Sequence, residues 1–278
     1  MTKRLNIFSL LLLVMFAEIQ RVCQEKMTYR TQLVLGVLTG FVGLAQFAIL
    51  GYYISLGGTP PGLDEYGDSV IAFMIIGSLF TAIALMMMNS LKMQIQSEQQ
   101  RGTLEAIALS GAGIFRFLVA GSVFGILSSL SSSVVIFTAF AVIFDFELNV
   151  NFFGLGIAIV SAALCMWLIG LCAASYILVS KQGEPVTWVV TTLLALFSGV
   201  MYPITVFPDS IVNALQYLPT VGMLHGIRIA LFSGASSMDV ITALTPTLFT
   251  IAIFLPLSSI FWKHGLQRAR CNGTLGTY

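Results

Sequence analysis

Few side chains in this sequence could carry chemistry, and they lie far apart. The 278 residues include only two His and four Cys. The apolar segment 240–262 is long enough to cross a membrane and separates His225 from His264, so no Ser–His pair is expected. The four Cys (Cys23, Cys165, Cys172 and Cys271) show no Cys/His spacing typical of a metal site. The sequence therefore predicts neither a catalytic site nor a metal site.

Nucleotide chemistry is not expected in this chain either. The phosphate-binding pattern Gly-x-x-x-x-Gly-Lys-Ser/Thr does not occur, and no Lys follows a Gly at any position. The net charge of +1 provides no basic surface for nucleic acid. We therefore expect no cofactor in this chain and no nucleic-acid partner.

The composition explains why such residues are scarce. Hydrophobic residues make up 57% of the chain, charged residues only 9%, and the mean hydropathy is +0.94. Soluble domains carry roughly 25% Asp, Glu, Lys and Arg, so a soluble enzyme is excluded. A disordered chain and a disulfide scaffold are excluded as well. The remaining class is an integral membrane protein, for which membrane lipid is a partner.

Six apolar segments without Asp, Glu, Lys or Arg can cross a bilayer as helices, since about 20 residues suffice. They are residues 33–56, 70–88, 117–144, 152–179, 186–207 and 240–262. We predict an all-α membrane protein with a six-helix transmembrane domain over residues 31–262 and a short tail over 263–278. Residues 1–30 are predicted to form an amphipathic interface helix; a cleaved signal is disfavoured because no small-residue cleavage site follows the first apolar run.

The Lys and Arg residues predict the orientation. Twelve of the 13 lie in the amino-terminal arm, after the second span, after the fourth span or in the tail, and only Arg228 lies on the other side. Because cytoplasmic loops carry the excess of Lys and Arg, both termini are predicted to be cytoplasmic. We expect a multi-pass protein of a plasma membrane, namely the bacterial or archaeal cytoplasmic membrane.

The predicted spans contain no Asp, Glu, Lys, Arg or His, which argues against ion coupling. Pumps and ion-coupled carriers use charged groups within the membrane, so energy for transport should enter from outside the spans. Small residues predict close helix contacts, at Gly36-x-x-x-Gly40 in the first span and Gly121-x-x-x-Gly125 in the third. The Ser residues between 128 and 133 suit either helix packing or a mildly polar face on a pathway.

The fifth segment is predicted to break near its outer end. Gly199 and Pro203 interrupt the apolar run and Pro208 follows, and Pro disrupts a helix because it lacks a donor. Two apolar stripes at helical spacing then predict two short helices that dip into the outer leaflet. They comprise Ile211, Val212, Leu215 and Leu218, ended by Pro219, and Met223, Leu224, Ile227 and Leu231. Asp209, His225 and Arg228 are expected near water.

The loop after the second span is the most informative segment. In Glu98-Gln99-Gln100-Arg101-Gly102-Thr103-Leu104-Glu105-Ala106-Ile107, Gly102 is predicted to end one helix and Thr103 to cap a short second one. Glu105 falls in its first turn, where a negative charge favours the helix dipole. Leu104 and Ile107 share an apolar face that fits either a groove in a partner or the lipid surface.

Three motifs in order resemble the type-2 ABC transporter permeases. They are Glu98 with Arg101-Gly102-Thr103-Leu104-Glu105; Lys181-x-Gly183-Glu184-Pro185-Val186-x-Trp188; and Gly199-Val200-x-Tyr202-Pro203 with Pro208, Leu218-Pro219 and Gly226-x-Arg228. The resemblance runs from the amino-terminal arm to Leu231. Family members often have Pro after the short helix, where this chain has Ser110-Gly111, so the end of that helix stays open.

The resemblance implies a function and partners. Two copies of such a subunit pair, as a homodimer or with a related permease, and each docks on a separate cytoplasmic ATPase subunit that binds ATP and Mg²⁺. The helix after Gly102 would be the coupling helix, with Leu104 and Ile107 in an apolar groove of the ATPase and with Glu98 and Glu105 at its rim. Further contacts would come from the amino-terminal helix and the loop that holds Lys181, Gly183 and Glu184. We expect an exporter of an amphipathic drug, lipid or lipid-linked glycan; the alternatives are an ion-coupled carrier and an intramembrane hydrolase.

Overall fold

The chain folds as a bundle of helices. The computed structural model describes residues 16–17, 20–21, 24, 30–58, 63, 69–109, 113–180, 188–189, 192–193 and 196–271, and no strand occurs among them. Within the described residues, five helices are long and apolar enough to cross a membrane: α2 (Arg30–Ser55), α3 (Val70–Gln100), α5 (Gly113–Ile143), α6 (Phe152–Ser180) and α11 (Thr245–Cys271). The shorter elements are α4 (Leu104–Leu109), η2 (Ile204–Val206), α8 (Asp209–Leu215), α9 (Pro219–Phe232) and α10 (Ser237–Ala243). The predicted all-α class is confirmed.

The first four predicted spans correspond to α2, α3, α5 and α6. The fifth, 186–207, is interrupted by residues 186–187, 190–191 and 194–195, which lie outside the described residues, so the number of six spans stays a prediction. The amino-terminal helix over residues 1–30 also lies almost entirely outside them. The tail from 263 continues α11 as far as Cys271, and the remaining residues are not described.

The sixth predicted segment is divided into two helices. A capping box starts α10, in which Ser236 Oγ accepts from Asp239 N and the Asp239 carboxylate accepts from Ser236 N. Pro246 then lies in the first turn of α11, and its missing N–H cannot satisfy Thr242 O. The Thr245 hydroxyl donates to that carbonyl instead, at 2.8 Å. The main-chain hydrogen bond that is missing at Pro246 explains why α10 and α11 are separate helices although they follow each other directly in the sequence.

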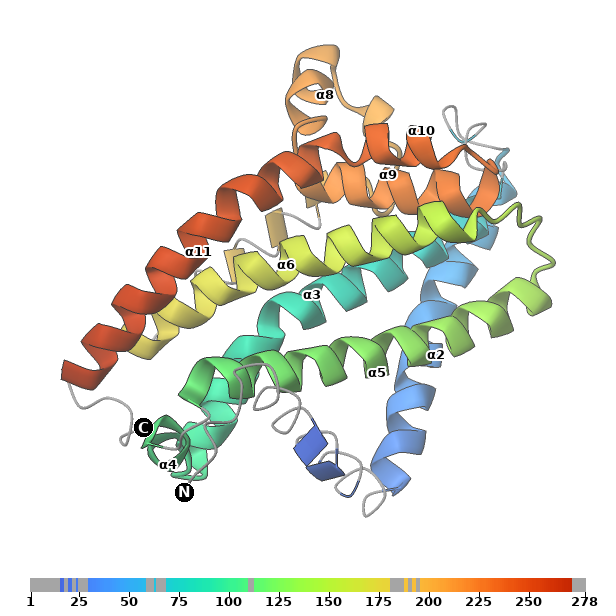
Figure 1. Ribbon diagram of the computed structural model, residues 1–278. Helices are drawn as coiled ribbons and strands as arrows, with labels where there is room; N and C mark the ends of the chain where they lie inside the picture. The colour runs from blue at the N-terminus through green and yellow to red at the C-terminus, as the bar shows by residue number, and fades with distance from the viewer. Residues whose placement is uncertain are drawn as a thin grey trace.

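The long helices are arranged so that the short ones lie at two opposite ends (Figure 1). α6 lies between α3 and α11, and α2 packs on α3 and α5. α4 follows α3 at one end of the bundle, whereas α8 and α10 lie at the other end. Any site built by α4 is therefore separated from a site built by α8 and α10 by the length of the spanning helices.

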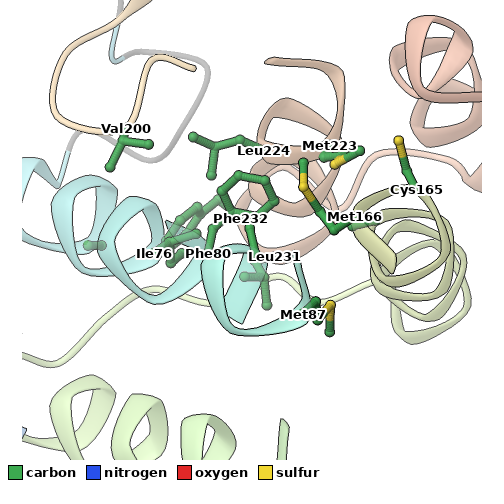
Figure 2. Close-up of a cluster of buried hydrophobic side chains, with 13 residues drawn as sticks. Ile76, Phe80, Met87, Cys165, Met166, Val200, Met223, Leu224, Leu231 and Phe232 are labelled. Carbon is green, nitrogen blue, oxygen red and sulfur yellow. The ribbon is translucent and has the colours of Figure 1, made fainter. Parts of the chain in front are cut away.

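α9 is packed into the bundle, and its side chains form much of the central core (Figure 2). Met223, Leu224, Leu231 and Phe232 of α9 meet Ile76 and Phe80 of α3 and Met166 of α6. Met223 and Leu224 are at most 1% exposed. The apolar stripe predicted from Met223 to Leu231 is therefore an interior face, which covers α3 and α6.

Main-chain hydrogen bonds tie the end of α9 to the start of α6. Asn149 N donates to Leu231 O at 3.0 Å, and Asn151 N donates to Ala230 O at 2.8 Å. The Asn151 side chain accepts from Gly154 N in the first turn of α6 and donates to Ala235 O. These bonds hold α9 and α10 firmly against the spanning helices.

Candidate coupling surface and the pocket at the opposite end

The turn between α3 and α4 is fixed by Gly102. Its φ is +70°, a left-handed conformation that glycine adopts without a steric penalty. Gly102 N donates to Gln99 O and Thr103 N donates to Glu98 O, both at 3.0 Å. This pair of bonds is the Schellman arrangement that ends many helices. The prediction that Gly102 ends the preceding helix is confirmed, because α3 ends at Gln100 and Gly102 makes the turn that follows.

Glu98 lies under this turn and is 2% exposed. Its Oε1 atom is 3.2 Å from Arg21 Nη1 and 3.7 Å from Arg101 Nη1. Its Oε2 atom accepts a short hydrogen bond from the Thr103 hydroxyl. A buried carboxylate requires such partners, because an unpaired charge is costly to bury. In the isolated subunit the described contacts of Glu98 are therefore within the chain, and its contact with the ATPase stays a prediction.

Leu104 is also an interior residue. It is 0% exposed and packs in a cluster with Leu91, Ile95 and Ile114. Ile107 packs against the same cluster and is half-buried. In the isolated subunit the apolar face of α4 closes on the ends of α3 and α5, and the contact of Leu104 with a groove in the ATPase stays a prediction. Periodicity identifies an apolar face but not the surface that it covers.

The exposed face of α4 is formed by other residues. Glu105 and Ala106 are exposed, and Leu109 is 82% exposed. An isolated helix of six residues would be unstable in water, so α4 depends on the buried Leu104 and on the turn at Gly102. The result is a short, anchored helix that presents one carboxylate and one large apolar side chain outward.

The other predicted coupling residues are only partly described. Lys181, Gly183 and Glu184 lie outside the described residues, as do Ser110 and Gly111. Arg21 belongs to the predicted amino-terminal helix and lies over the Phe117 ring, 5.5 Å from its centroid, as well as beside Glu98. It thus connects the amino-terminal arm to the α3–α4 turn and to α5.

At the opposite end Arg228 is buried, with an exposure of 4%. Its guanidinium donates to Gly199 O at 2.9 Å and to Phe73 O and Val200 O at 3.1 Å. It also lies over the Phe73 ring at 3.4 Å, within cation–π range. The prediction that Arg228 lies near water is wrong, because α9 packs its face inward. Asp209, by contrast, is exposed as expected, and His225 is half-buried.

The break before η2 is centred on Gly199 rather than on Pro203. Gly199 has a φ of +70°, which turns the chain, and Pro203 follows in an extended conformation immediately before η2. Pro208 and Pro219 then occupy helix starts: Pro208 precedes α8, and Pro219 is the first residue of α9. The bend leaves the carbonyls of Gly199 and Val200 available, and Arg228 satisfies them.

The predicted glycine pairs differ in their surroundings. A Cβ on Gly121 would lie 2.5 Å from Gln94 Oε1, and those on Gly40 and Gly125 would lie 3.1 Å and 3.3 Å from the ends of flexible side chains. A Cβ on Gly36 would meet nothing within 4 Å in this chain. Of the four glycines, Gly121 has the closest neighbour, the amide end of the Gln94 side chain, and Gly36 has none within 4 Å.

The closest backbone approaches involve glycines outside those pairs. A Cβ on Gly170 of α6 would lie 2.5 Å from Met88 O of α3, and one on Gly265 of α11 would lie 2.8 Å from Ser175 O of α6. A Cβ on Gly77 would collide with Val200 O and lie 3.0 Å from Arg228 Nη2. Isolated glycines carry no spacing signal, so the sequence did not indicate them.

A pocket of about 940 Å³ opens beside Arg228. It is bounded by residues within 198–205, by Gln216 and Tyr217 just after α8, by α9, by the end of α10 and by the start of α11. Arg228, His225 and Gln216 line it together with several hydroxyl groups, and Phe249 and Ile253 supply an apolar wall. Ligand pockets commonly measure about 300–1,000 Å³, so this pocket has the size of a binding site. The described residues contain no group of three or more His, Cys, Asp and Glu side chains that could hold a metal ion.

Comparison with known proteins identifies the family. No curated protein matches the chain. The family model described as ABC-2 type transporter matches residues 9–232, which is most of the chain and includes α4, the Gly199 break and α9. Members of this family are membrane subunits for transport, generally non-catalytic, that work with an ATP-binding partner. With its five described apolar helices, the chain is a multi-pass membrane protein that belongs to the ABC-2 type transporter family as a permease subunit.

Proposed function

We propose that this chain is the permease of an ABC exporter, which moves an amphipathic drug, lipid or lipid-linked glycan outward while a separate subunit hydrolyses ATP. The observation that carries the proposal is the anchored α4 helix. It is joined to α3 by the Gly102 turn and is held by the buried Leu104, so a force on α4 would be transmitted to α3 and α5. A coupling element needs this combination of an exposed contact face and a rigid connection.

The proposed docking surface is the outward face of α4. Glu105 and Leu109 are its exposed charged and apolar side chains. Leu109 would enter an apolar depression of the ATPase subunit, and Glu105 would lie at its margin. Glu98 would support this surface from inside the subunit, because its contacts with Arg21 and Arg101 join the amino-terminal arm to the same turn. Lys181, Gly183 and Glu184 of the second loop are proposed to add contacts.

The proposed assembly contains two permease copies and two ATPase subunits in a bacterial or archaeal cytoplasmic membrane. ATP and Mg²⁺ would be bound by the ATPase, since this chain has no phosphate-binding loop. The excess of Lys and Arg supports an orientation with α4 and both termini in the cytoplasm. The predicted sixth span over residues 186–207 and the membrane-dipping position of α8 and α9 belong to this proposal.

Two experiments test the proposal. A Cys at Gly57 should react with an impermeant thiol reagent from outside intact cells, whereas a Cys at Gln100 should not; the reverse pattern would overturn the orientation. The permease should also co-purify with its ATPase, and amphipathic compounds should stimulate ATP hydrolysis by the complex. A complex that forms but whose ATP hydrolysis ignores every amphipath would contradict the exporter function.

The alternative functions have weaker support. An ion-coupled carrier would use charged groups within the spans, and the six apolar segments predicted as spans contain none. For a hydrolase, His225 lines one pocket with Ser198 and another with Ser233 and Asp239. The Asp239 carboxylate, however, accepts from Ser236 N and Ser236 Oγ, so it caps α10. The exporter therefore remains the function that the geometry supports best.

A further inference from the structure

A second pocket, which we call the groove, lies where α5 and α6 both pack on α3 (Figure 1). Its volume is about 140 Å³. Residues of all three helices line it, together with Ile227 and Leu231 of α9. Among the described residues that line the groove, every side chain is apolar except that of Ser133. The groove is therefore suited to an apolar ligand and not to a charged one.

The groove follows the spanning helices at the middle of their length. On α3 its lining runs from Ile76 to Met87, a rise of about 16 Å at 1.5 Å per residue. These residues lie on both sides of the centre of the apolar segment 70–88. A segment of this kind crosses a hydrocarbon layer of about 30 Å. The medium beside the groove is therefore the acyl chains of the bilayer and not water.

The groove has a buried floor and an open side. Phe80, Met87 and Met166 belong to the floor and are at most 7% exposed (Figure 2). Val134 of α5 also lines the groove but is 61% exposed, and Ser133 beside it is half-buried. The groove therefore opens along α5 to the surface of the subunit, where a chain of the surrounding lipid can enter it.

The size and polarity of the groove restrict its occupant. Water is a poor candidate, because a buried water needs several polar partners and Ser133 supplies a single hydroxyl. A helix of a second copy is about 10–12 Å wide with its side chains, which is too wide for a groove of this volume. An apolar cavity of about 150 Å³ takes up benzene or xenon, so a narrow apolar molecule fits. At this depth of the membrane that molecule is an acyl chain.

From these features we infer that the groove binds one acyl chain of a membrane lipid, which remains with the subunit as a structural component. The chain contacts α3, α5, α6 and α9 together and supplies the dispersion contacts that an empty groove lacks. Lipid chains are as apolar as Leu side chains, so binding depends on the fit of the chain and not on its removal from water. The inference goes beyond the proposed function, since it involves neither ATP nor the transported substrate.

The first test measures lipid that the purified full-length permease retains. The protein is extracted in glyco-diosgenin, a detergent whose rigid steroid body does not fit a narrow groove, and is then titrated with palmitoyl-oleoyl phosphatidylcholine. Native mass spectrometry counts the bound lipid. We expect one lipid to bind with a saturable affinity, and thermal unfolding to shift upward as it binds, because a ligand of the folded state stabilises that state. Binding that rises without saturation, or no retained lipid, would overturn the inference.

Matched variants of α5 locate the lipid. Ser133→Phe puts a ring into the groove, whereas Ser131→Phe makes the same change on an exposed part of α5 that does not line the groove. Ser133→Phe should weaken lipid binding about tenfold, and Ser131→Phe should bind like the parent. Ser133→Ala keeps the groove open and should retain the lipid, and Ser133→Leu should give an intermediate loss if the ring prevents folding. Equal effects at positions 131 and 133 would place the lipid elsewhere.

A cross-linking experiment distinguishes the lipid from a second copy of the chain. Val134→Cys lies at the open side of the groove. If a lipid chain enters there, the variant in membranes should react with a lipid-soluble maleimide and form no more disulfide-linked dimer than the parent does under mild oxidation. A dimer that forms only in Val134→Cys would show that another copy covers the groove and would overturn the inference. ATP-driven transport is not measured in any of these tests, so their failure leaves the proposed exporter function unaffected.

Discussion

Leu104 and Leu109 lie at the two ends of α4 and should respond in opposite ways to truncation. Leu104 is 0% exposed in the cluster with Leu91, Ile95 and Ile114, whereas Leu109 is 82% exposed. Leu104→Ala leaves a cavity in this cluster, and buried Leu→Ala changes cost about 2–5 kcal/mol. A six-residue helix has no independent stability to offset that loss. We expect α4 to detach from the bundle in the variant.

Leu109→Ala removes a side chain that has few contacts in the isolated subunit. Its effect on the free energy of unfolding should stay within about 0.5 kcal/mol, as at most surface positions. If Leu109 is buried in the complex, its loss should weaken ATPase binding by about 1.5–3 kcal/mol, which is roughly 10- to 150-fold in Kd.

The assay measures two quantities for each variant. Thermal unfolding of the purified permease reports stability, and titration with the ATPase subunit reports affinity. Leu104→Ala should lower the unfolding temperature and, through detachment of α4, also the affinity; Leu109→Ala should lower the affinity alone. The reasoning would be refuted if Leu104→Ala unfolded like the parent, or if Leu109→Ala bound the ATPase with unchanged affinity.

Three further changes test other parts of the structure. Gly102→Ala forces a side chain into a φ of +70° and should cost about 1–2 kcal/mol in thermal unfolding, whereas Gly102→Asn should cost less; equal effects would contradict the role of the left-handed turn. Arg228→Met should destabilise the permease by about 3 kcal/mol, because the carbonyls of Gly199 and Val200 lose their donor, and Arg228→Lys should recover only part of this. Gly121→Leu should lower the yield of folded subunit through its collision with Gln94. Gly36→Leu should leave the folded monomer unchanged, so that any effect is on assembly with a second copy. Loss of the folded monomer in Gly36→Leu would show that the amino-terminal span packs differently.

The helical class, the location of the first four spanning segments and the turn at Gly102 could all be predicted from the sequence, because each depends on local physics. About 20 apolar residues without charge must become a helix in lipid, whatever their neighbours are. A Gly between a helix and a new apolar stripe marks a helix end through its own conformational freedom. The family motifs were recognisable for the same reason, since they are contiguous or nearly so.

The surface that each apolar or charged residue meets was decided only by the tertiary structure. Leu104 and Ile107 were correctly placed on one face of α4, and in the isolated subunit that face covers the chain's own core. Glu98 and Arg228 are charged residues, which usually lie at the surface. They are buried here because Arg21, Arg101 and the carbonyls at the Gly199 break provide partners. Arg21 lies 77 residues from Glu98 along the chain and Gly199 lies 29 residues from Arg228, so no local pattern specifies these partners. Periodicity determines which residues share a face, whereas packing determines what that face touches.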